Sequence, residues 1–200
     1  MKKGKLISIC GIDGSGKTTQ SRLLNKYLDE KGFNVFHLPK MPSFGGWIID
    51  CLKGEYESSK LITSDIINLV EISDRIRYLT EYCEKILNYK DTIIISERYT
   101  YSYIARAITQ QCNPNTINVL KVLYKACLRP DMTIFLDVSP KIAVERVETR
   151  GYDSEDLQRL INLDNAYKTL GEFSDFQVIN AEHSIDVVHK SIKECVDKKF

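Results

Sequence analysis

The strongest chemical signal in the chain is the spacing G-x-x-x-x-G-K-[ST], which is formed by Gly11, Gly16, Lys17 and Thr18. It lies in the stretch GIDGSGKTTQ, and this spacing is typical of a loop that binds the phosphates of a nucleotide. The apolar run KLISIC comes directly before it and predicts the buried strand that such a loop follows. The sequence therefore predicts a binding site for a nucleoside triphosphate.

Each residue type in this loop has a physical role. Glycines let successive backbone N–H groups turn inward around a phosphate without clashes from a Cβ atom. Lys17 adds a positive charge, and the hydroxyl of Thr18 can bind Mg²⁺ at the start of a helix whose positive end faces the same anion. The expected ATP-binding residues of the loop are Gly11, Gly14, Ser15, Gly16, Lys17, Thr18 and Thr19.

Two further residues with the chemistry of phosphoryl transfer follow a predicted buried strand, TIIIS. Glu97 can hold a water bound to Mg²⁺, and Arg98 can bind a phosphate with two parallel hydrogen bonds. The structural alternative is an ion pair that caps the end of the strand. Because ligands of doubly wound sheets bind beyond the carboxyl ends of the strands, we favour the catalytic interpretation.

A third candidate is the polar segment at about 146–157. Arg146 and Arg150 lie four residues apart on one predicted helical face, and Gly151 ends that helix. Such a segment can close over bound phosphates as a lid, supply arginine charge and exclude water. The structural alternative is a charged face in solvent.

Strand-like and helix-like segments alternate along the chain, and this pattern predicts an α/β protein with a largely parallel sheet. The 200 residues suit a single domain, residues 1–200. The expected strands are 5–10, 34–38, 92–96, 132–137 and 176–180. The expected helices are about 17–31, 47–52, 64–88, 114–128 and 140–150.

The bulk composition narrows the partners. The formal net charge is +1, which gives no basic surface for nucleic acid, and no apolar stretch is long enough to cross a membrane. The six cysteines form no C-x-x-C pair and are expected to be buried, reduced thiols of a cytoplasmic protein.

Four stretches together resemble the thymidylate kinase family: GIDGSGKTTQ, ERYTYS, RPDMTIFLDVSPKIAVERVETRG and FQVINAEHSIDVVHKSI. The resemblance runs from about Lys5 to the C-terminus, in the order of the family. It implies a P-loop NTPase fold, a three-layer sandwich with a five-stranded parallel sheet and helices on both faces. It also implies a homodimer that uses Mg²⁺ and transfers the γ-phosphoryl group of ATP to a nucleoside monophosphate, with dTMP as the expected acceptor.

The resemblance also implies roles for single residues. Asp13 approaches the 3′-hydroxyl of the acceptor sugar, Arg98 binds the acceptor phosphate and Tyr99 lines the acceptor site. Arg146 flanks the adenine and Arg150 belongs to the lid. Because Gly14 stands where some members carry an arginine, charge in the transition state is expected from the lid, so the expected catalytic residues are Lys17, Glu97, Arg98 and Arg150.

The acceptor site departs from the family pattern. Glu97 replaces the usual aspartate, as in the related deoxynucleoside kinases. The loop after the second strand lacks the arginine that usually binds the acceptor phosphate, and only Lys40 could substitute for it, with less specific geometry. Glu71 stands where a phenylalanine usually precedes the base-reading arginine, here Arg75, and Arg106 stands where a tyrosine is usual. Glu71 can accept hydrogen bonds from the base, or form an ion pair with Arg75 one helical turn away.

These departures leave alternatives open. The acceptor can be another nucleotide or a specialised phosphorylated metabolite, or the enzyme can be a deoxynucleoside kinase. A guanine nucleotide switch is disfavoured, because its N-K-x-D motif should follow a late strand, and the nearest match, NKYLD, lies in the first helix. A binding role without catalysis is disfavoured by the presence of Lys17, Thr18, Glu97 and Arg98.

Overall fold

The computed structural model describes residues 4–38, 63–151 and 154–200. Its centre is one sheet of five parallel strands in the order β2-β3-β1-β4-β5. The strands are β1 (Lys5–Cys10), β2 (Asn34–Leu38), β3 (Thr92–Glu97), β4 (Met132–Asp137) and β5 (Gln177–Asn180). The predicted α/β fold with a parallel sheet is confirmed, and Phe176 is the one expected strand residue outside the strands.

The central strands are buried on both faces, which explains their continuous apolar sequences. β1 lies between β3 and β4, so that Ile7 is opposite Ile95 on one side and Met132 on the other. All residues of β3 are buried, and all of β1 except Lys5. Their buried apolar side chains belong to one contiguous hydrophobic core.

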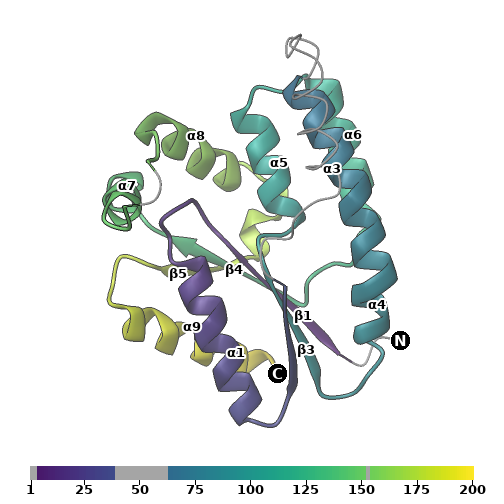
Figure 1. Ribbon diagram of the computed structural model, residues 1–200, viewed down its shortest axis with the longest axis vertical. Coiled ribbons are helices and arrows are strands. Elements are labelled where there is room, and N and C mark those ends of the chain that lie inside the picture. The colour runs from purple at the N-terminus through teal and green to yellow at the C-terminus, as the bar shows by residue number, and fades with distance from the viewer. Residues whose placement is uncertain (1–3, 39–62, 152–153) are drawn as a thin grey trace.

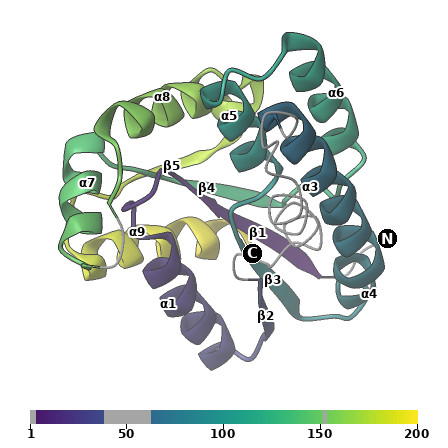
Figure 2. The ribbon, with the colours of Figure 1, turned by 45° about the horizontal axis from the view of Figure 1, so that its top comes forward.

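Helices cover both faces of this sheet (Figures 1 and 2). The helices on one face are α1 (Lys17–Glu30) and α9 (Ile185–Lys199), which contact each other. The helices on the other are α3 (Ser64–Tyr78), α5 (Thr100–Thr109), α6 (Pro114–Lys125) and α8 (Leu157–Lys168). The helix α7 (Pro140–Glu148) packs beside α8. This arrangement follows from right-handed crossovers between parallel strands.

The long helix expected at 64–88 is interrupted. After α3 the chain forms a π-helical turn, Leu79–Cys83, and then the short helix α4, Glu84–Ile86. The hydroxyl of Thr80 donates to the carbonyl of Ile76 at 2.8 Å, a local bond of the kind that bends helices. Such π turns occur often at functional sites, and Leu79 of this one lines the pocket described below.

Three helices were not identified from the sequence: α5, α8 and α9. The helices expected at 114–128 and 140–150 end earlier, at Lys125 and Glu148. Lys40 and the short helix expected at 47–52 lie outside the described residues.

The predicted thiols and the absence of a membrane helix agree with the described part of the chain. Its five cysteines form no disulfide, and all except Cys195 are buried. No helix in residues 4–38, 63–151 and 154–200 is both long and apolar enough to cross a membrane.

Candidate active site

The loop after β1 and the junction after β3 meet at one edge of the sheet. β1 and β3 are neighbours, and the N–H of Arg98 donates to the carbonyl of Ile9 at 2.9 Å, which extends their pairing past the strand end. From β1 the chain runs towards β2, and from β3 it crosses back over β1 to β4. A doubly wound sheet binds ligands in the crevice at such a point.

The phosphate loop is shaped by its close approach to α7. Gly14 has a φ of +81°, and a Cβ atom there would lie 2.3 Å from the carbonyl oxygen of Ala143. A side chain at this position is therefore both strained and blocked by backbone. This explains why the loop carries no arginine here and why charge must come from another element.

Lys17 lies buried beneath the loop. Its Nζ donates to the carbonyl of Ile12 at 2.6 Å and lies 3.9 Å from Oδ1 of Asp13. Burial, with the nearby charge of Arg98, lowers the pKa of Lys17 to about 7. The nearby carboxylate of Asp13 raises the pKa of Lys17 too little to offset this lowering. An anion bound in the crevice would therefore stabilise the protonated form of Lys17.

Glu97 forms a cluster of polar contacts at the start of α1. Its Oε2 accepts from the hydroxyl of Thr18 at 2.7 Å, and its Oε1 accepts from the hydroxyl of Ser21 at 2.7 Å. Nε2 of His37, at the end of β2, lies 2.9 Å from the same Oε1. Arg98 forms its ion pair with Asp13 of the phosphate loop, so the ion pair at this strand end joins it to the loop.

Thr18 and Glu97 fit the requirements of Mg²⁺. Hydroxyl and carboxylate oxygens are the hard ligands that this cation prefers, and it uses few of them because it keeps several waters and binds substrate phosphates. The Thr18 hydroxyl donates its hydrogen bond to Glu97, so the lone pairs of its oxygen remain available to the cation.

Asp13 is the anion around which three cations gather. Arg98 forms an ion pair with its Oδ1, Nη2 of Arg159 lies 3.1 Å from Oδ2, and Lys17 is close by. Burial opposes the ionisation of Asp13, but these cations outweigh it and hold the pKa of the carboxyl below its usual value. Arg98 itself has a φ of +65°, an uncommon conformation for a non-glycine residue that the described structure also shows at Asp91 and Gln111.

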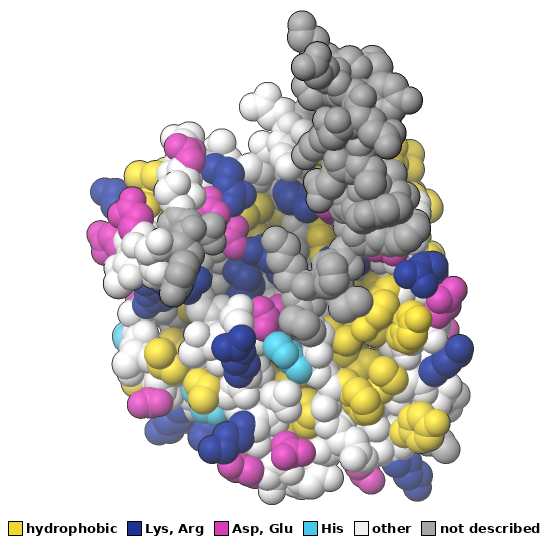
Figure 3. All heavy atoms as spheres, in the orientation of Figure 1, with side chains coloured by type: hydrophobic (Ala, Val, Ile, Leu, Met, Phe, Trp, Pro, Cys, Tyr) yellow, Lys and Arg dark blue, Asp and Glu magenta, His cyan; other side chains and the backbone are white. Residues whose placement is uncertain are grey.

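Arg159 was missed by sequence analysis. It lies in the first turn of α8 and also pairs with Glu155, just before this helix, at 2.6 Å. The spacing of four residues between Glu155 of the lid segment and Arg159 was the one signal for it in the sequence. Figure 3 shows several Lys and Arg side chains, dark blue, bordering the hollow in the middle of this face of the molecule.

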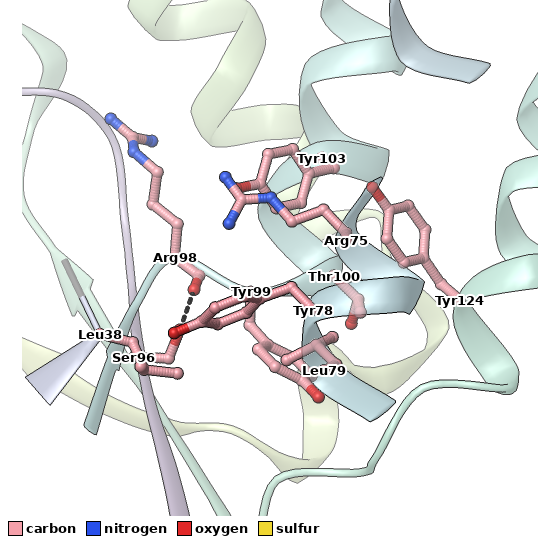
Figure 4. Close-up of a pocket in the computed structure, with 10 residues that line it drawn as sticks. All are labelled: Leu38, Arg75, Tyr78, Leu79, Ser96, Arg98, Tyr99, Thr100, Tyr103 and Tyr124. Atoms are coloured by element: carbon pink, nitrogen blue, oxygen red, sulfur yellow. Dashed lines mark hydrogen bonds between the residues drawn. The ribbon is translucent and has the colours of Figure 1, made fainter. Parts of the chain in front are cut away.

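A pocket opens beside Arg98, between α3 and α5 (Figure 4). The guanidinium carbon of Arg75 lies 4.7 Å from the ring centroid of Tyr103. The Nε atom of Arg75 is buried and has no hydrogen-bond partner among the described residues. The Nε atom of Arg106 is likewise buried without such a partner, but of the two arginines Arg75 is the one that lines this pocket.

Tyr99 forms a wall of this pocket without offering a polar group to it. Its side chain is buried and its hydroxyl donates to the carbonyl of Leu128, away from the crevice. Burial raises the pKa of Tyr99, so the phenol stays neutral.

Glu71 is bound to α5. Its carboxylate pairs with Arg106, whose Nη2 also donates to Oδ1 of Asn68 at 2.9 Å. The guanidinium carbon of Arg106 lies 5.3 Å from the ring centroid of Tyr103. The expected ion pair of Glu71 with Arg75 is not the one seen among the described residues, because Arg106 takes that place. Both arginines flank the tyrosine, and Glu71 holds one of them.

A second hollow lies on the other side of the phosphate loop. Nη1 of Arg146 donates to the carbonyl of Ala181 at 2.8 Å, and Nη2 lies 3.3 Å from the carbonyl of Glu182. Arg146 is therefore fixed against the segment after β5, which rules out a purely solvated face.

Arg150 lines both this hollow and the one around Lys17 and Asp13. Ser15 and Thr19 line the hollow beside Arg146.

The three hollows are neighbours and share lining residues. Gly14, Gly16 and Arg150 are shared between the hollow beside Arg146 and the one around Lys17, and Arg98 is shared between the latter and the pocket of Arg75. The two larger hollows therefore lie on either side of the phosphate loop, and the small pocket of Arg75 lies beyond Arg98.

Comparison with known proteins gives consistent matches over nearly the whole chain. The sequence profile of the family described as thymidylate kinase matches residues 9–192. A probable thymidylate kinase of Pyrococcus abyssi is 31% identical over 199 residues, which cover 95% of this chain and 94% of the relative. A probable thymidylate kinase of Staphylothermus marinus is 30% identical over 198 residues, which cover 96% of this chain and 94% of the relative. The thymidylate kinase of Thermosipho africanus is 28% identical over 203 residues, covering 96% and 97%.

Proposed function

The chain belongs to the thymidylate kinase family, and from that premise we propose that it transfers the γ-phosphoryl group of ATP to the 5′-phosphate of dTMP. One observation carries the proposal. Arg98 lines both the hollow around Lys17 and the pocket around Arg75, so this residue lies at the boundary between the donor site and the acceptor site, where its guanidinium can bind the acceptor phosphate. A protein that only binds a nucleotide needs no such second pocket.

The donor occupies the phosphate loop and the hollow beside Arg146. Backbone N–H groups and Lys17 hold the β- and γ-phosphates, and Arg146 flanks the adenine where the carbonyls of 181 and 182 fix it. Phosphate binding returns Lys17 to its charged form. Thr18 and Glu97 hold Mg²⁺, which when bound neutralises charge on the phosphates.

The acceptor phosphate replaces Asp13 as the partner of Arg98. An oxygen of the acceptor phosphate attacks the γ-phosphorus, and the bond from that phosphorus to the β–γ bridging oxygen breaks, giving ADP. Arg98, Arg150 and Lys17 stabilise the negative charge on the γ-phosphoryl group during its transfer. Arg159, which lies against Asp13, is close enough to contribute as well. Asp13, released, is free to bind the 3′-hydroxyl of the acceptor sugar.

The segment at about 146–157 acts as the lid. It links the end of α7 to the start of α8 and carries Arg150 and Glu155 on the hollow around Lys17. Closure of this segment excludes water and so favours transfer over hydrolysis. With it, residues 1–200 form a single kinase domain.

The pocket of Arg75 favours a base with a carbonyl at its edge. Arg75 offers hydrogen-bond donors, whereas the carboxylate of Glu71 is already occupied by Arg106. An amino group, as on cytosine, would meet the wrong partner. Thymine and uracil present a carbonyl there, which supports dTMP over cytidine acceptors.

We further propose a cytoplasmic homodimer. α3 and α6 pack together and leave Ile66, Val119 and Val122 exposed, an apolar surface suited to a second copy. Light scattering after size exclusion gives the mass, with twice the chain mass of 23.0 kDa expected.

A coupled assay of ADP formation tests the proposed function, with Mg²⁺, ATP and a panel of dTMP, dUMP, CMP, UMP, GMP, AMP and thymidine. The highest kcat/KM is expected for dTMP. Preference for CMP would overturn the assignment of Arg75 and Glu71. Turnover of thymidine alone would indicate a deoxynucleoside kinase.

A further inference from the structure

The mechanism above leaves one partly buried polar side chain next to the metal-binding residues unexplained. His37 is the fourth residue of β2, opposite Ile95 of β3, and its side chain is 19% exposed. Its Nε2 lies 2.9 Å from Oε1 of Glu97 and 3.0 Å from the hydroxyl oxygen of Ser21. The ring can donate to the carboxylate in the tautomer that carries its proton on Nε2, because an ionised carboxylate can only accept.

The contacts divide the two oxygens of Glu97 between different elements. Oε1 accepts a hydrogen bond from Ser21 of α1 and faces Nε2 of His37 of β2, while Oε2 accepts a hydrogen bond from Thr18. With Oε1 fixed from two sides, the carboxylate cannot rotate away from Thr18. Partners of this kind, one step removed from a metal, orient its ligands.

We propose that His37 is a positioning residue that holds the Glu97 carboxylate against Thr18, so that the site takes up the Mg²⁺ of the donor nucleotide. The proposal rests on the proposed function only for Mg²⁺ and ATP as the donor. It does not depend on the identity of the acceptor.

The length of the Glu97 side chain supports this pairing. An aspartate is one methylene shorter, roughly 1.5 Å, and could not reach Thr18 and His37 together. Glu97 and His37 therefore act as a unit, and substitutions of the two should not be additive.

The test is the Mg²⁺ dependence of ATP binding, measured by calorimetry without an acceptor. In His37→Leu the Mg²⁺ concentration for half-maximal tightening of ATP binding should rise about tenfold. His37→Gln, whose amide nitrogen can take the place of Nε2, should stay close to wild type, whereas His37→Asn, whose amide falls short, should resemble His37→Leu. His189→Gln, on α9, is the matched control for loss of a partly buried histidine.

Binding of ATP in EDTA should be equal in all four variants, which separates metal positioning from damage to the phosphate loop. In a Glu97→Asp background, His37→Leu should cause little further rise in the Mg²⁺ concentration needed for half-maximal tightening of ATP binding. An unchanged Mg²⁺ requirement in His37→Leu, or an equal loss in both backgrounds, would overturn the proposal. If His37→Leu fails to fold, the contrast between His37→Gln and His37→Asn decides, and equal behaviour of these two counts against the proposal. Failure to phosphorylate dTMP refutes the proposed function and leaves this binding result standing.

Discussion

Arg98 and Asp13 form an ion pair across the crevice between the β3–α5 junction and the phosphate loop. The pair joins the two motifs on which a phosphoryl transfer depends. It also holds the Arg98 guanidinium at the point where the donor and acceptor phosphates must meet, with a carboxylate that a phosphate can replace as its partner.

Replacing Arg98 should disable transfer while sparing donor binding. Arg98→Ala is expected to lower kcat/KM for dTMP by about 10²–10³, with ATP affinity changed by less than threefold in calorimetry. Arg98→Lys should recover only part of the loss, because a point charge cannot make two parallel hydrogen bonds. The matched control is Arg129→Ala, which breaks an exposed pair with Asp175 and should keep full activity. Wild-type kcat/KM in Arg98→Ala is incompatible with the mechanism.

The lowered pKa of Lys17 predicts proton uptake on ATP binding. At a pH below the pKa of about 7, Lys17 is already protonated in the protein without ATP. Above it, binding must protonate Lys17, so ATP affinity falls as pH rises, by at most about tenfold per pH unit. Calorimetry at pH 8 in buffers of different ionisation enthalpy should show uptake of up to one proton. Lys17→Arg, which stays charged, is the control, and an equal uptake by this variant would refute the assignment.

Gly14 should tolerate no side chain. Gly14→Ala puts a Cβ atom 2.3 Å from the Ala143 carbonyl in a left-handed conformation, so the loop must move. A loss of ATP affinity of more than about tenfold is expected, equivalent to about 1.4 kcal/mol. Gly32→Ala has a φ of +89° with open space around it, so it should cost stability alone, about 1–2 kcal/mol. Equal ATP binding by both variants would contradict this account of the loop.

The Glu71–Arg106 pair should influence the acceptor and not the donor. Glu71→Gln leaves Arg106 with a weaker partner and loosens one side of Tyr103. KM for dTMP should rise several-fold with KM for ATP unchanged, and stability should fall by about 1–3 kcal/mol. Glu81→Gln, which weakens the exposed pair with Arg77, is the control for loss of a helical charge. A change in KM for ATP alone would place Glu71 in a different role.

The sequence predicted the local parts of the site well, because they are encoded by contiguous residues. The phosphate loop, the central strands and the position of Glu97 and Arg98 at a strand end follow from residue type, spacing and periodicity. The parallel order of strands then brings the β1 and β3 ends together without further information.

The contacts between distant elements could not be predicted in this way. Local spacing favoured a partner for Glu71 on its own helix, but the packing of α3 against α5 brings Arg106 to it. His37 reaches Glu97 only because β2 pairs with β3, and Arg159 reaches Asp13 only because α8 covers the phosphate loop. Nothing in the sequence periodicity indicates these distances.

Phosphorus NMR of the wild-type protein with ATP, Mg²⁺ and dTMP tests the central claim most directly, because it identifies both products in one sample. The account predicts that dTDP and ADP appear in equal amounts, with little inorganic phosphate. ADP with inorganic phosphate and no dTDP would contradict it.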